Sequence, residues 1–527
     1  MSKYQKRDNS VNTLDEFIYK KTGLSIAALN TYKDEYAIQH LQKAADEIRD
    51  AIKDGRPIVV YGDYDADGIT SLIILTLLLI SLKAKVRIIA PRRFTDGYGI
   101  SEASFAKKDI PDGCLLITVD NGITAVAAMR YAIEHSMRVV ILDHHLAGDT
   151  IPEHHVLIDP EAIPNSAEFD GYCGAGLSFK LCELMNPKIL PYAVAFAAIG
   201  TVADVVPLKE DNRRIVQAGL RSINRGTVPY GLKKVISLFG LDGHCTAEDL
   251  AFSIAPAINA RGRLEDNGGT YTIKTLLSNG LNADTLAAEM IAKNNERKEI
   301  VKQLMASVSP DANDKVNFLV VDGTWPGLFG LAAGKIQEET GKPTFIMSNN
   351  NGIVSGSARS DDETKNDVSA MLRSVKDLLL GFGGHPGAAG FRFEEKNLHT
   401  IHERLSDYDV KPHEEKYLYD LDLNPIEAKA IRMQMDNAEP FGKGLEKPVY
   451  RITCHFNGDR YWNTMGKLKE HCSFSLPYGL KAVMFSRAEE YKSLGCPKDI
   501  YLYGSLEWDW LRGRKTVKFR VSDFEII

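Results

Sequence analysis

The amino-acid sequence predicts an α/β protein of several domains. The first domain should contain a mostly parallel sheet, and a long helix should join it to a smaller α/β domain that is followed by an OB-like β-barrel. Three observations support this prediction: strands alternate with helical stretches near the N-terminus, one long stretch of helical period follows, and the C-terminal region is rich in strands. With 527 residues, the chain is also too long for a single hydrophobic core.

The strands of the first domain are short apolar runs separated by stretches of helical period, at residues 58–61, 86–90, 115–119 and 139–142. This alternation is typical of βαβ units, in which the strands of one sheet run parallel and helices cover both faces. Ligands of such sheets bind at the carboxyl ends of the strands. We therefore expect functional side chains directly after these four runs.

Acidic residues and histidines follow three of the four runs, and a further aspartate lies in the apolar segment IGTVADVVPL: Asp63, Asp65, Asp67, Asp120, Asp143, His144, His145 and Asp204. A lone aspartate after a strand is ordinarily a helix N-cap or an Asx turn, and a lone histidine pair is commonly structural. So many at successive strand ends of one sheet favour a metal site instead. A buried Asp204 would also be costly without a cation.

The run GDYDADG predicts hard-cation chemistry by itself. Residues two apart in an extended segment point the same way, so Asp63, Asp65 and Asp67 could converge on one point. Their mutual repulsion would be prohibitive without cations, and oxygen ligands favour Mg²⁺ or Mn²⁺.

Composition narrows the class of protein. The formal net charge is −6, which argues against a protein that simply coats nucleic acid, but residues 441–527 hold 15 Lys and Arg against 10 Asp and Glu. A basic C-terminal module on an acidic body is therefore expected. Seven scattered cysteines without a CxxC pair indicate reduced thiols, and no apolar run approaches the ~20 residues of a membrane span, so we expect a cytoplasmic protein.

Two further elements follow from periodicity. Residues 282–308 have helical apolar spacing with charges between, which predicts the connecting helix; its NNERK segment is a solvated face or lines a DNA passage. The C-terminal module carries a hairpin signal at Asn457-Gly458 and alternating strands around Arg512 and Gly513. An OB-like barrel would stack single-stranded bases on some of its aromatic residues, the candidates being Tyr461, Trp462, Tyr501, Tyr503, Trp508 and Trp510.

Taken in order, the motifs GDYDADG (62–68), VDNG (119–122), DHH (143–145) and ADVVP (203–207) resemble the DHH phosphoesterase superfamily. The segments PRRFTDGYG (91–99), NARGRL (259–264), SGSARS (355–360) and GGHPGAAG (383–390) are similar to its RecJ exonuclease branch, including the DHHA1 domain. The resemblance covers about residues 50–527. It implies an N-terminal helical segment (1–50), a DHH domain (51–280), a connecting helix (281–310), a DHHA1 domain (311–410) and an OB-like domain (415–527).

The resemblance also implies a set of site residues. Two divalent ions, Mn²⁺ or Mg²⁺, would be held by Asp63, Asp65, Asp67, Asp120, His144 and Asp204, with Asp120 as the bridge. His145 would face the scissile phosphate, and Asp143 would orient a neighbouring histidine. Substrate contacts would come from Arg93, Arg263, Ser357, Arg359, Gly383, Gly384, His385, Trp462 and Trp508. The alternative for Arg93 and Arg263 is an ordinary surface salt bridge.

Two departures from the RecJ pattern limit what is carried over. The segment TWPGLFG (324–330) lacks the histidine of the WHPG-type sequence, so a contact made there is not transferred. The chain is expected to lack any additional C-terminal domain, and partner binding by such a domain is not transferred either.

The expected function is a metal-dependent 5′→3′ exonuclease that hydrolyses single-stranded DNA to mononucleotides in DNA repair or recombination. It would act as a monomer, with a single-strand-binding protein or a helicase as candidate partner. One alternative is a small-substrate phosphodiesterase of the same superfamily, against which the long chain and the basic, aromatic C-terminal module argue. The other is a non-catalytic replication scaffold, against which the complete set of expected ligands argues.

Overall fold

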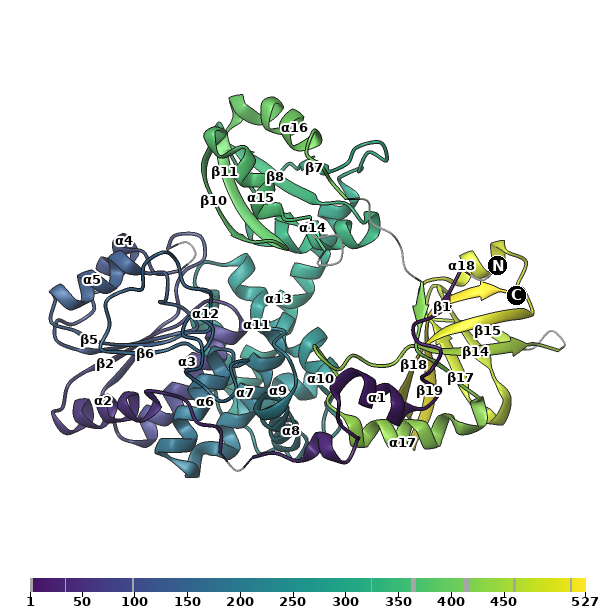
Figure 1. Ribbon diagram of the computed structural model, residues 1–527, viewed down its shortest axis with the longest axis horizontal. Helices are drawn as coiled ribbons and strands as arrows, with labels where there is room; N and C mark the ends of the chain where they lie inside the picture. Colours follow the sequence, from purple (N-terminus) through teal and green to yellow (C-terminus); the bar gives the residue numbers. More distant parts are fainter. Residues whose placement is uncertain are drawn as a thin grey trace. The chain divides into compact units, whose positions relative to one another are not determined.

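The computed structural model describes residues 3–33, 35–96, 99–323, 325–361, 366–411, 417–457, 461–511 and 514–527 (Figure 1). The chain forms two compact units. The first, called the terminal unit, combines residues 1–36, 205–217 and 415–527; the second, called the catalytic unit, combines residues 37–204 and 218–414. Among the described residues, every helix is too short or too polar to cross a lipid bilayer.

The catalytic unit begins with a five-stranded parallel sheet in the order β3-β2-β4-β5-β6. Its strands are β2 (Ile58–Tyr61), β3 (Val86–Ile89), β4 (Leu115–Val119), β5 (Arg138–Leu142) and β6 (Val156–Ile158). The four runs that the sequence predicted are all strands, and β6 is an additional one. Strands β2 and β4 are buried along their whole length because helices cover both faces, as the continuous apolar runs indicate.

Helices α4 and α5 lie on one face of this sheet, and α2, α3 and α6 lie on the other (Figure 1). Helix α3 is apolar almost all round because it packs between the sheet and the helices α6 and α7. The bounds of these helices are α2 (Leu41–Lys53), α3 (Ala66–Ser81), α4 (Glu102–Ala106), α5 (Val126–Glu134), α6 (Gly174–Met185) and α7 (Leu190–Ala203).

A helical layer follows the sheet and ends in the long helix that the sequence predicted, α13 (Gly280–Ala306). The layer consists of α8 (Glu210–Asn224), α9 (Tyr230–Leu238), α10 (Ala247–Asp249), the π-helical turn η3 (Leu250–Ile254), α11 (Ala255–Leu264) and α12 (Gly268–Leu276). Helix α13 packs against α9 and α11 over its first half and against α14 of the next domain.

The smaller α/β domain has a five-stranded sheet in the order β10-β11-β9-β8-β7. Only β7 and β8 run parallel. The strands are β7 (Asn317–Val320), β8 (Thr344–Asn350), β9 (Ile353–Arg359), β10 (Leu379–His385) and β11 (Ala388–Glu394), and the helices are α14 (Pro326–Thr340), α15 (Val368–Ser374) and α16 (Leu398–Ser406). The SGSARS segment therefore forms the central strand, and GGHPGAAG forms the β10–β11 hairpin.

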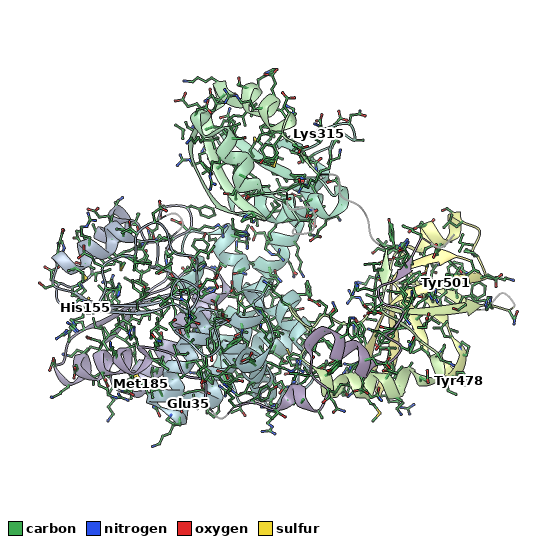
Figure 2. All side chains as sticks on the ribbon, in the orientation of Figure 1. Glu35, His155, Met185, Lys315, Tyr478 and Tyr501 are labelled. Carbon is green, nitrogen blue, oxygen red and sulfur yellow. The ribbon has the colours of Figure 1, made fainter. Side chains whose placement is uncertain are left out.

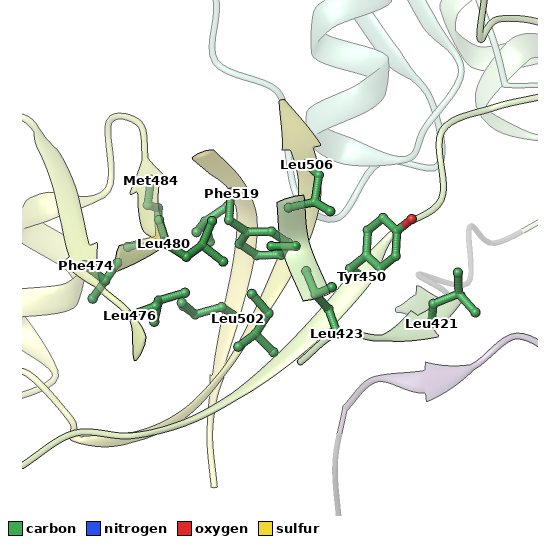
Figure 3. Packing of buried hydrophobic residues seen from close by; sticks show 14 of the residues in the cluster. Leu421, Leu423, Tyr450, Phe474, Leu476, Leu480, Met484, Leu502, Leu506 and Phe519 are labelled. Atoms are coloured by element: carbon green, nitrogen blue, oxygen red, sulfur yellow. The ribbon is translucent and has the colours of Figure 1, made fainter. Parts of the chain in front are cut away.

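The terminal unit contains a seven-stranded sheet in the order β13-β14-β18-β19-β17-β16-β15. Its strands are β13 (Leu421–Asp422), β14 (Tyr450–His455), β15 (Trp462–Met465), β16 (His471–Ser475), β17 (Lys481–Met484), β18 (Asp499–Leu511) and β19 (Arg514–Ile526); its helices are α1 (Leu14–Thr22), α17 (Ala428–Ala438) and α18 (Ala488–Ser493). Residues such as Phe474, Leu502 and Phe519 form its core (Figure 3). The sheet is OB-like, but no pairing of β13 with β15 closes it into the predicted barrel among the described residues.

One of two local features of the terminal unit differs from the sequence-based expectation. Strands β14 and β15 flank the Asn457-Gly458 signal, yet β14 pairs with β18 and β15 pairs with β16, so they form no hairpin with each other. Gly458 itself lies outside the described residues. The long β18–β19 hairpin is present as expected, and its tip residues Arg512 and Gly513 also lie outside the described residues.

The N-terminal segment predicted as residues 1–50 is divided between the two units at Tyr36 and Ala37. Its first part supplies Leu14, Phe17 and Ile18 of α1 to the core of the terminal unit. Strand β1 (Gln5–Lys6) pairs with β12 (Leu418–Tyr419), and the Tyr4 ring stacks on Tyr503 at a centroid distance of 3.6 Å. The first 36 residues are thus part of the C-terminal fold, which their sequence spacing does not indicate.

A buried cation helps to join residues 205–217 to this unit. Arg213 of α8 is 2% exposed, and its guanidinium donates to the carbonyl oxygens of Ala438, Glu439 and Pro440 at 2.7–2.9 Å. These carbonyls follow the last turn of α17, where a helix leaves acceptors without partners. Arg213 therefore holds the start of α8 against the end of α17.

We predict that Arg213→Ala lowers the stability of the terminal unit by about 3 kcal/mol, because three buried carbonyl groups lose a charged donor. Differential scanning calorimetry of the full chain should show a lower Tm for one transition. Arg221→Ala on the same helix, where the side chain is exposed, should change Tm by less than a degree or two. Equal effects of the two variants would contradict the role given to Arg213.

Candidate metal centre and arginine cluster

Three acidic residues follow the ends of neighbouring parallel strands. Asp63 comes after β2, Asp120 directly after β4 and Asp143 directly after β5, and they are 5%, 2% and 1% exposed. Because β2, β4 and β5 are adjacent and parallel, their carboxyl ends meet at one edge of the sheet. The βαβ pattern thus brings these aspartates together as the sequence predicted.

The segment Asp63–Asp67 converges in a different way from that expected. It is not extended: Asp65 is the N-cap of α3, and Asp67 lies in the first turn of that helix. The Asp65 carboxylate accepts hydrogen bonds from the backbone N–H groups of Asp67 and Gly68, each at 3.1 Å. Asp65 therefore serves as a helix cap while its carboxylate lies within 4.8 Å of the donor atoms of Asp63 and Asp120.

A second helix N-terminus holds the Asp67 carboxylate. The backbone N–H groups of Gly174 and Ala175, at the start of α6, donate to its two oxygens at 2.7 and 2.9 Å. A Cβ atom at position 174 would lie 2.7 Å from the Asp120 Cβ and 3.1 Å from an Asp67 oxygen. Glycine is therefore required at position 174, because α6 approaches both aspartates too closely for a side chain.

His144 lies at the centre of the acidic group. Its Nε2 atom is 3.1 Å from the Asp120 carboxylate and 3.7 Å from that of Asp67, and its Nδ1 atom is 3.7 Å from Asp204 at the end of α7. Burial lowers the pKa of His144, so the neutral ring, which can bind a metal, is favoured. Asp120 has a left-handed backbone with φ of +58°, a conformation that costs free energy and recurs at functional sites.

The donor atoms form three overlapping groups in which all atoms lie within 4.8 Å of one another. The groups are Asp63 with Asp65 and Asp120, Asp67 with His144 and Asp204, and Asp120 with His144 and His145. Asp120 and His144 each belong to two groups. A set made of carboxylates and one or two imidazoles fits Mn²⁺ or Mg²⁺, and the sharing of Asp120 fits two adjacent ions.

The pKa values of these carboxyl groups show the cost of their arrangement without cations. Burial, and then the charge of Asp65, raises the pKa of Asp63 to about 7. Burial and the charges of Asp67, Asp65, Asp63 and Asp204 raise the pKa of Asp120 well above its ordinary value. Both shifts have the sign expected for anions that need bound cations to stay ionised at neutral pH.

Asp143 is bonded differently from the other acids. It accepts hydrogen bonds from the N–H groups of Ile123 and His144 and from Nδ1 of His145, at 2.7–2.9 Å. Burial alone would raise the pKa of Asp143, but the hydrogen bond and charge of His145 bring it below the ordinary value. For His145 the directions are reversed: burial would lower its pKa, but the hydrogen bond and charge of Asp143 raise the pKa to about 9. This arrangement matches the orienting role expected for Asp143.

Electrostatic interactions connect Arg93 and Arg263 with Asp63 and Asp65 of the acidic group, and connect Arg93 and Arg263 in turn with Arg359 and Arg297. Within the described residues, none of these four arginines forms an ion pair. We call them the arginine cluster. Burial, and then the charge of Arg93, lowers the pKa of Arg263 to about 10 and also lowers that of Arg359. The guanidinium groups remain cationic at neutral pH, so the cluster offers a binding site for anions, and the salt-bridge alternative for Arg93 and Arg263 is not observed.

The two α/β domains meet at this cluster. Arg263, in the last turn of α11, donates to the carbonyl oxygen of Gly327 at the start of α14. The Arg359 guanidinium lies over Gly330, one turn further along α14. The shortened TWPGLFG segment therefore still makes an inter-domain contact, through Gly327; Thr324 lies outside the described residues.

Other predicted substrate residues of the smaller domain lie on its strands. Ser357 and Arg359 share one face of β9, as the alternation predicted. Gly383, Gly384 and His385 are exposed at the end of β10, an edge strand of the sheet. Their contact with a substrate stays a prediction.

The aromatic candidates of the terminal unit separate by burial. Tyr461 and Tyr503 are buried in the core and cannot stack on bases. Trp462 is half-buried with its ring edge against Tyr491, and the Trp508 indole donates to Asp436 beneath the Lys515 ammonium group. Trp510, on the β18–β19 hairpin, is 47% exposed, and Tyr501 is half-buried (Figure 2).

Sequence reasoning missed three contributors to this region: Arg297 of α13, the backbone amides of α6 and the Tyr64 ring. Arg297 lies in the NNERK segment, where its guanidinium forks onto the Asn294 side chain. Tyr64 separates Asp63 from Asp65 and supports the Arg93 guanidinium 4.7 Å from its ring centroid. The GAG sequence at 174–176 was the one available signal for the α6 amides, because small residues permit close approach.

Comparison with protein families assigns three segments of the chain. Residues 57–201 match the DHH family N-terminal domain, residues 313–408 match the DHHA1 domain, and residues 419–523 match the RecJ OB domain. The acidic group lies largely in the first segment, and Ser357 and Arg359 lie in the second.

Curated relatives and a solved structure agree with these matches. The chain is similar to the single-stranded-DNA-specific exonuclease RecJ of Bacillus subtilis (33% identical, 93% of this chain, 64% of the relative) and of Thermus thermophilus (30%, 92% and 71%). The crystal structure of T. thermophilus RecJ in complex with Mn²⁺ superimposes with a TM-score of 0.81 at 27% identity, over 97% of this chain and 75% of that one.

The chain spans slightly less than two thirds of the length of the B. subtilis relative and more than two thirds of the T. thermophilus one. The similarity includes the DHH, DHHA1 and OB segments together, in the same order. The chain therefore belongs to the RecJ family of DHH phosphoesterases.

Proposed function

We propose that this protein is a metal-dependent 5′→3′ exonuclease that hydrolyses single-stranded DNA to mononucleotides. The observation that carries the proposal is the juxtaposition of the acidic donor groups with the arginine cluster, which forms no ion pair with a carboxylate in the described part of the chain. The first arrangement suits divalent cations, and the second suits the phosphates of a nucleic-acid strand. The relatives named above support DNA as the substrate and single strands as its form.

Each residue has a separable task in this proposal. Asp63, Asp65, Asp67, Asp120, His144 and Asp204 would hold two Mn²⁺ or Mg²⁺ ions, with Asp120 shared between them. When bound, the ions supply a water of lowered pKa and neutralise charge on the phosphate. His145, kept protonated by Asp143, donates to a phosphate oxygen as negative charge develops.

The arginine cluster and β9 would hold the strand. Arg93, Arg263 and Arg359 bind backbone phosphates next to the cleaved bond, with Ser357 and the Gly383–His385 segment as further contacts. We assign the 5′ end to this cluster, which follows from the similarity to RecJ proteins. The terminal unit, with its basic excess and exposed Trp510, would bind the single strand further along.

Other elements of the proposal rest on the sequence alone. We infer a role in repair or recombination, a monomeric state, a cytoplasmic location, and delivery of substrate by a single-strand-binding protein or a helicase. All seven cysteines are free thiols, as expected for a reducing compartment.

Polarity and substrate form can be tested with end-labelled DNA. With Mn²⁺ present, a single strand labelled at the 5′ end should lose its label early as mononucleotide, while a 3′-labelled strand should shorten gradually and blunt duplex should resist. Turnover of a dinucleotide equal to or better than that of the long strand would instead support the small-substrate alternative. Binding without any hydrolysis would support the scaffold alternative.

Removing the shared ligand should separate chemistry from DNA binding. We expect Asp120→Ala to reduce kcat at least a thousandfold, because both cation sites lose a donor, while the affinity for single-stranded DNA in the presence of Ca²⁺ changes by less than about threefold. A control, Asp112→Ala, removes an exposed aspartate before the same strand and should be active. Cleavage by the Asp120 variant at a tenth of the wild-type rate would contradict the shared role.

Mn²⁺ should also stabilise the catalytic unit in the absence of DNA. At a concentration 100 times Kd, binding to the native state alone adds about 2.7 kcal/mol, so Tm should rise by several degrees and EDTA should reverse the rise. The increase should be smaller in Asp120→Ala, which has lost both the repulsion and the ligand. An unchanged wild-type Tm would argue against a preformed metal site.

The contribution of the terminal unit should depend on strand length. Trp510→Ala should weaken binding of a long single strand by about tenfold, which corresponds to the loss of one stacked base, and should hardly affect a short oligonucleotide. Tyr19→Ala, on α1 of the same unit and 63% exposed, serves as the aromatic control and should leave both affinities unchanged. Equal weakening of short and long strands by Trp510→Ala would show that the hairpin does not act as an extended binding surface.

A further inference from the structure

The loop that carries Arg93 is fastened to a distant part of the chain by one carboxylate. Asp266, in the turn between α11 and α12, accepts hydrogen bonds from the backbone N–H groups of Phe94 and Thr95 at 3.0 and 3.2 Å. Its other oxygen accepts from the Thr95 hydroxyl at 2.8 Å. Both oxygens of Asp266 are thus committed to the two residues directly after Arg93.

The turn that holds Asp266 is itself rigid. A Cβ atom at Gly268 would lie 2.3–2.5 Å from the backbone of Arg261 and Gly262, so α12 begins in direct contact with the last turn of α11. A Cβ atom at Gly269 would meet the Ala90 side chain at 3.1 Å, just before the Arg93 loop begins. The start of the loop and its anchor are therefore packed on the same helix end.

The rest of the loop adds a second anchor on the other side. Asp96 accepts from the Arg92 backbone N–H at 2.8 Å and forms a buried ion pair with Lys108. The two aspartates fix the loop on both sides of Arg93, and Asp266 connects it to the segment that carries Arg263. Asp266 lies three positions after Arg263 in the sequence.

The hydrogen bonds of Asp266 hold the Arg93 loop in place against repulsion between arginine side chains. Arg93 lowers the pKa of both Arg263 and Arg359, so the three cations disfavour one another. The Arg93 guanidinium is supported from below by the Tyr64 ring, while a Cβ atom at Gly262 would lie 3.4 Å from the Tyr64 carbonyl oxygen. Without a link between the Arg93 loop and the α11–α12 turn, Arg93 would be free to move away into solvent.

We propose that Asp266 is a positioning residue, which holds Arg93 beside Arg263 so that the two guanidinium groups bind phosphates of one strand at a fixed separation. Asp266 touches neither substrate nor metal ligand in this role; it acts through the loop backbone. The inference rests on the proposed function, because the separation of the arginines matters only for a ligand with more than one phosphate or a long phosphodiester strand.

The test is a double-mutant cycle with steady-state cleavage of a 5′-phosphorylated single strand in Mn²⁺. Asp266→Ala should raise KM about tenfold and lower kcat by a smaller factor, because strand binding is lost while the acidic donor groups are intact. Arg93→Ala should raise KM at least as much. In the double variant, KM should stay within about twofold of the Arg93→Ala value, since Asp266 has nothing left to position.

Conservative variants separate positioning from general stability. Asp266→Asn retains an oxygen for the two backbone N–H groups, so its KM should lie within about threefold of the wild type. Thr95→Val removes only the hydrogen bond from the Thr95 hydroxyl to Asp266 and should raise KM about threefold. This variant tests the positioning role even if Asp266→Ala lowers Tm. Asp311→Ala removes a turn carboxylate that accepts from the Asn313 backbone elsewhere in the catalytic unit, and should change neither constant.

The two proposals fail in different ways. Wild-type protein that leaves the strand intact would overturn the proposed exonuclease function. Wild-type cleavage combined with an unchanged KM in Asp266→Ala would overturn the positioning role, and so would a double variant whose KM is the product of the two single effects. A loss of kcat without a change in KM would also contradict it, because it would place Asp266 in the chemistry rather than in strand binding.

Discussion

The burial of several carboxylates at one edge of a parallel sheet is the constraint on which the rest of the catalytic unit depends. Asp63, Asp67 and Asp120 are each at most 5% exposed, and burial together with mutual repulsion raises the pKa of Asp63 and of Asp120. A set of buried carboxylates is tolerated only if hydrogen-bond donors surround it. The chain supplies these donors from helix N-termini: α3 is capped by Asp65, and α6 points its first amides at Asp67. The need for cations then follows from the repulsion that remains.

The same edge of the sheet holds Asp143, whose hydrogen bonding differs from that of the other acids. The difference distinguishes an aspartate expected to orient a histidine from those expected to bind metal. Asp143 is as buried as Asp120, yet its pKa lies below the ordinary value because backbone amides and the His145 ring satisfy its oxygens. It has little to offer a metal ion. Asp120 lies near the imidazoles of His144 and His145 and near four acidic residues, so it needs external charge. Within the DHH triplet, burial therefore favours the neutral form of His144, which can bind a metal, whereas Asp143 keeps His145 cationic.

The sequence predicted the layout of the site better than its local geometry. Short apolar runs between stretches of helical period identified the strands, and parallel strands bring their ends together, so the positions of Asp63, Asp120 and Asp143 followed directly. The conformation of Asp65 and Asp67 did not, because the choice between an extended segment and a helix cap depends on α6 packing from a hundred residues away. The attachment of residues 1–36 and 205–217 to the terminal unit was missed for the same reason: Tyr4 on Tyr503 and Arg213 on the end of α17 are tertiary contacts without a local pattern. The pairing of β14 with β18 similarly overrode a local turn signal.

Opposite charges lie close together in this centre without neutralising one another, and the spacing explains how. Burial lowers the pKa of Arg263 and the charge of Asp65 partly offsets that shift, yet no ion pair joins the arginine cluster to the acids among the described residues. Tyr64 lies between them: burial raises the pKa of its hydroxyl to about 12, so the ring stays neutral, and its face supports Arg93. A direct Asp–Arg pair would satisfy both partners and leave neither a metal site nor an anion site. A neutral aromatic spacer keeps the carboxylates available for cations and the guanidinium groups available for phosphates, which is the condition for binding a phosphodiester across both.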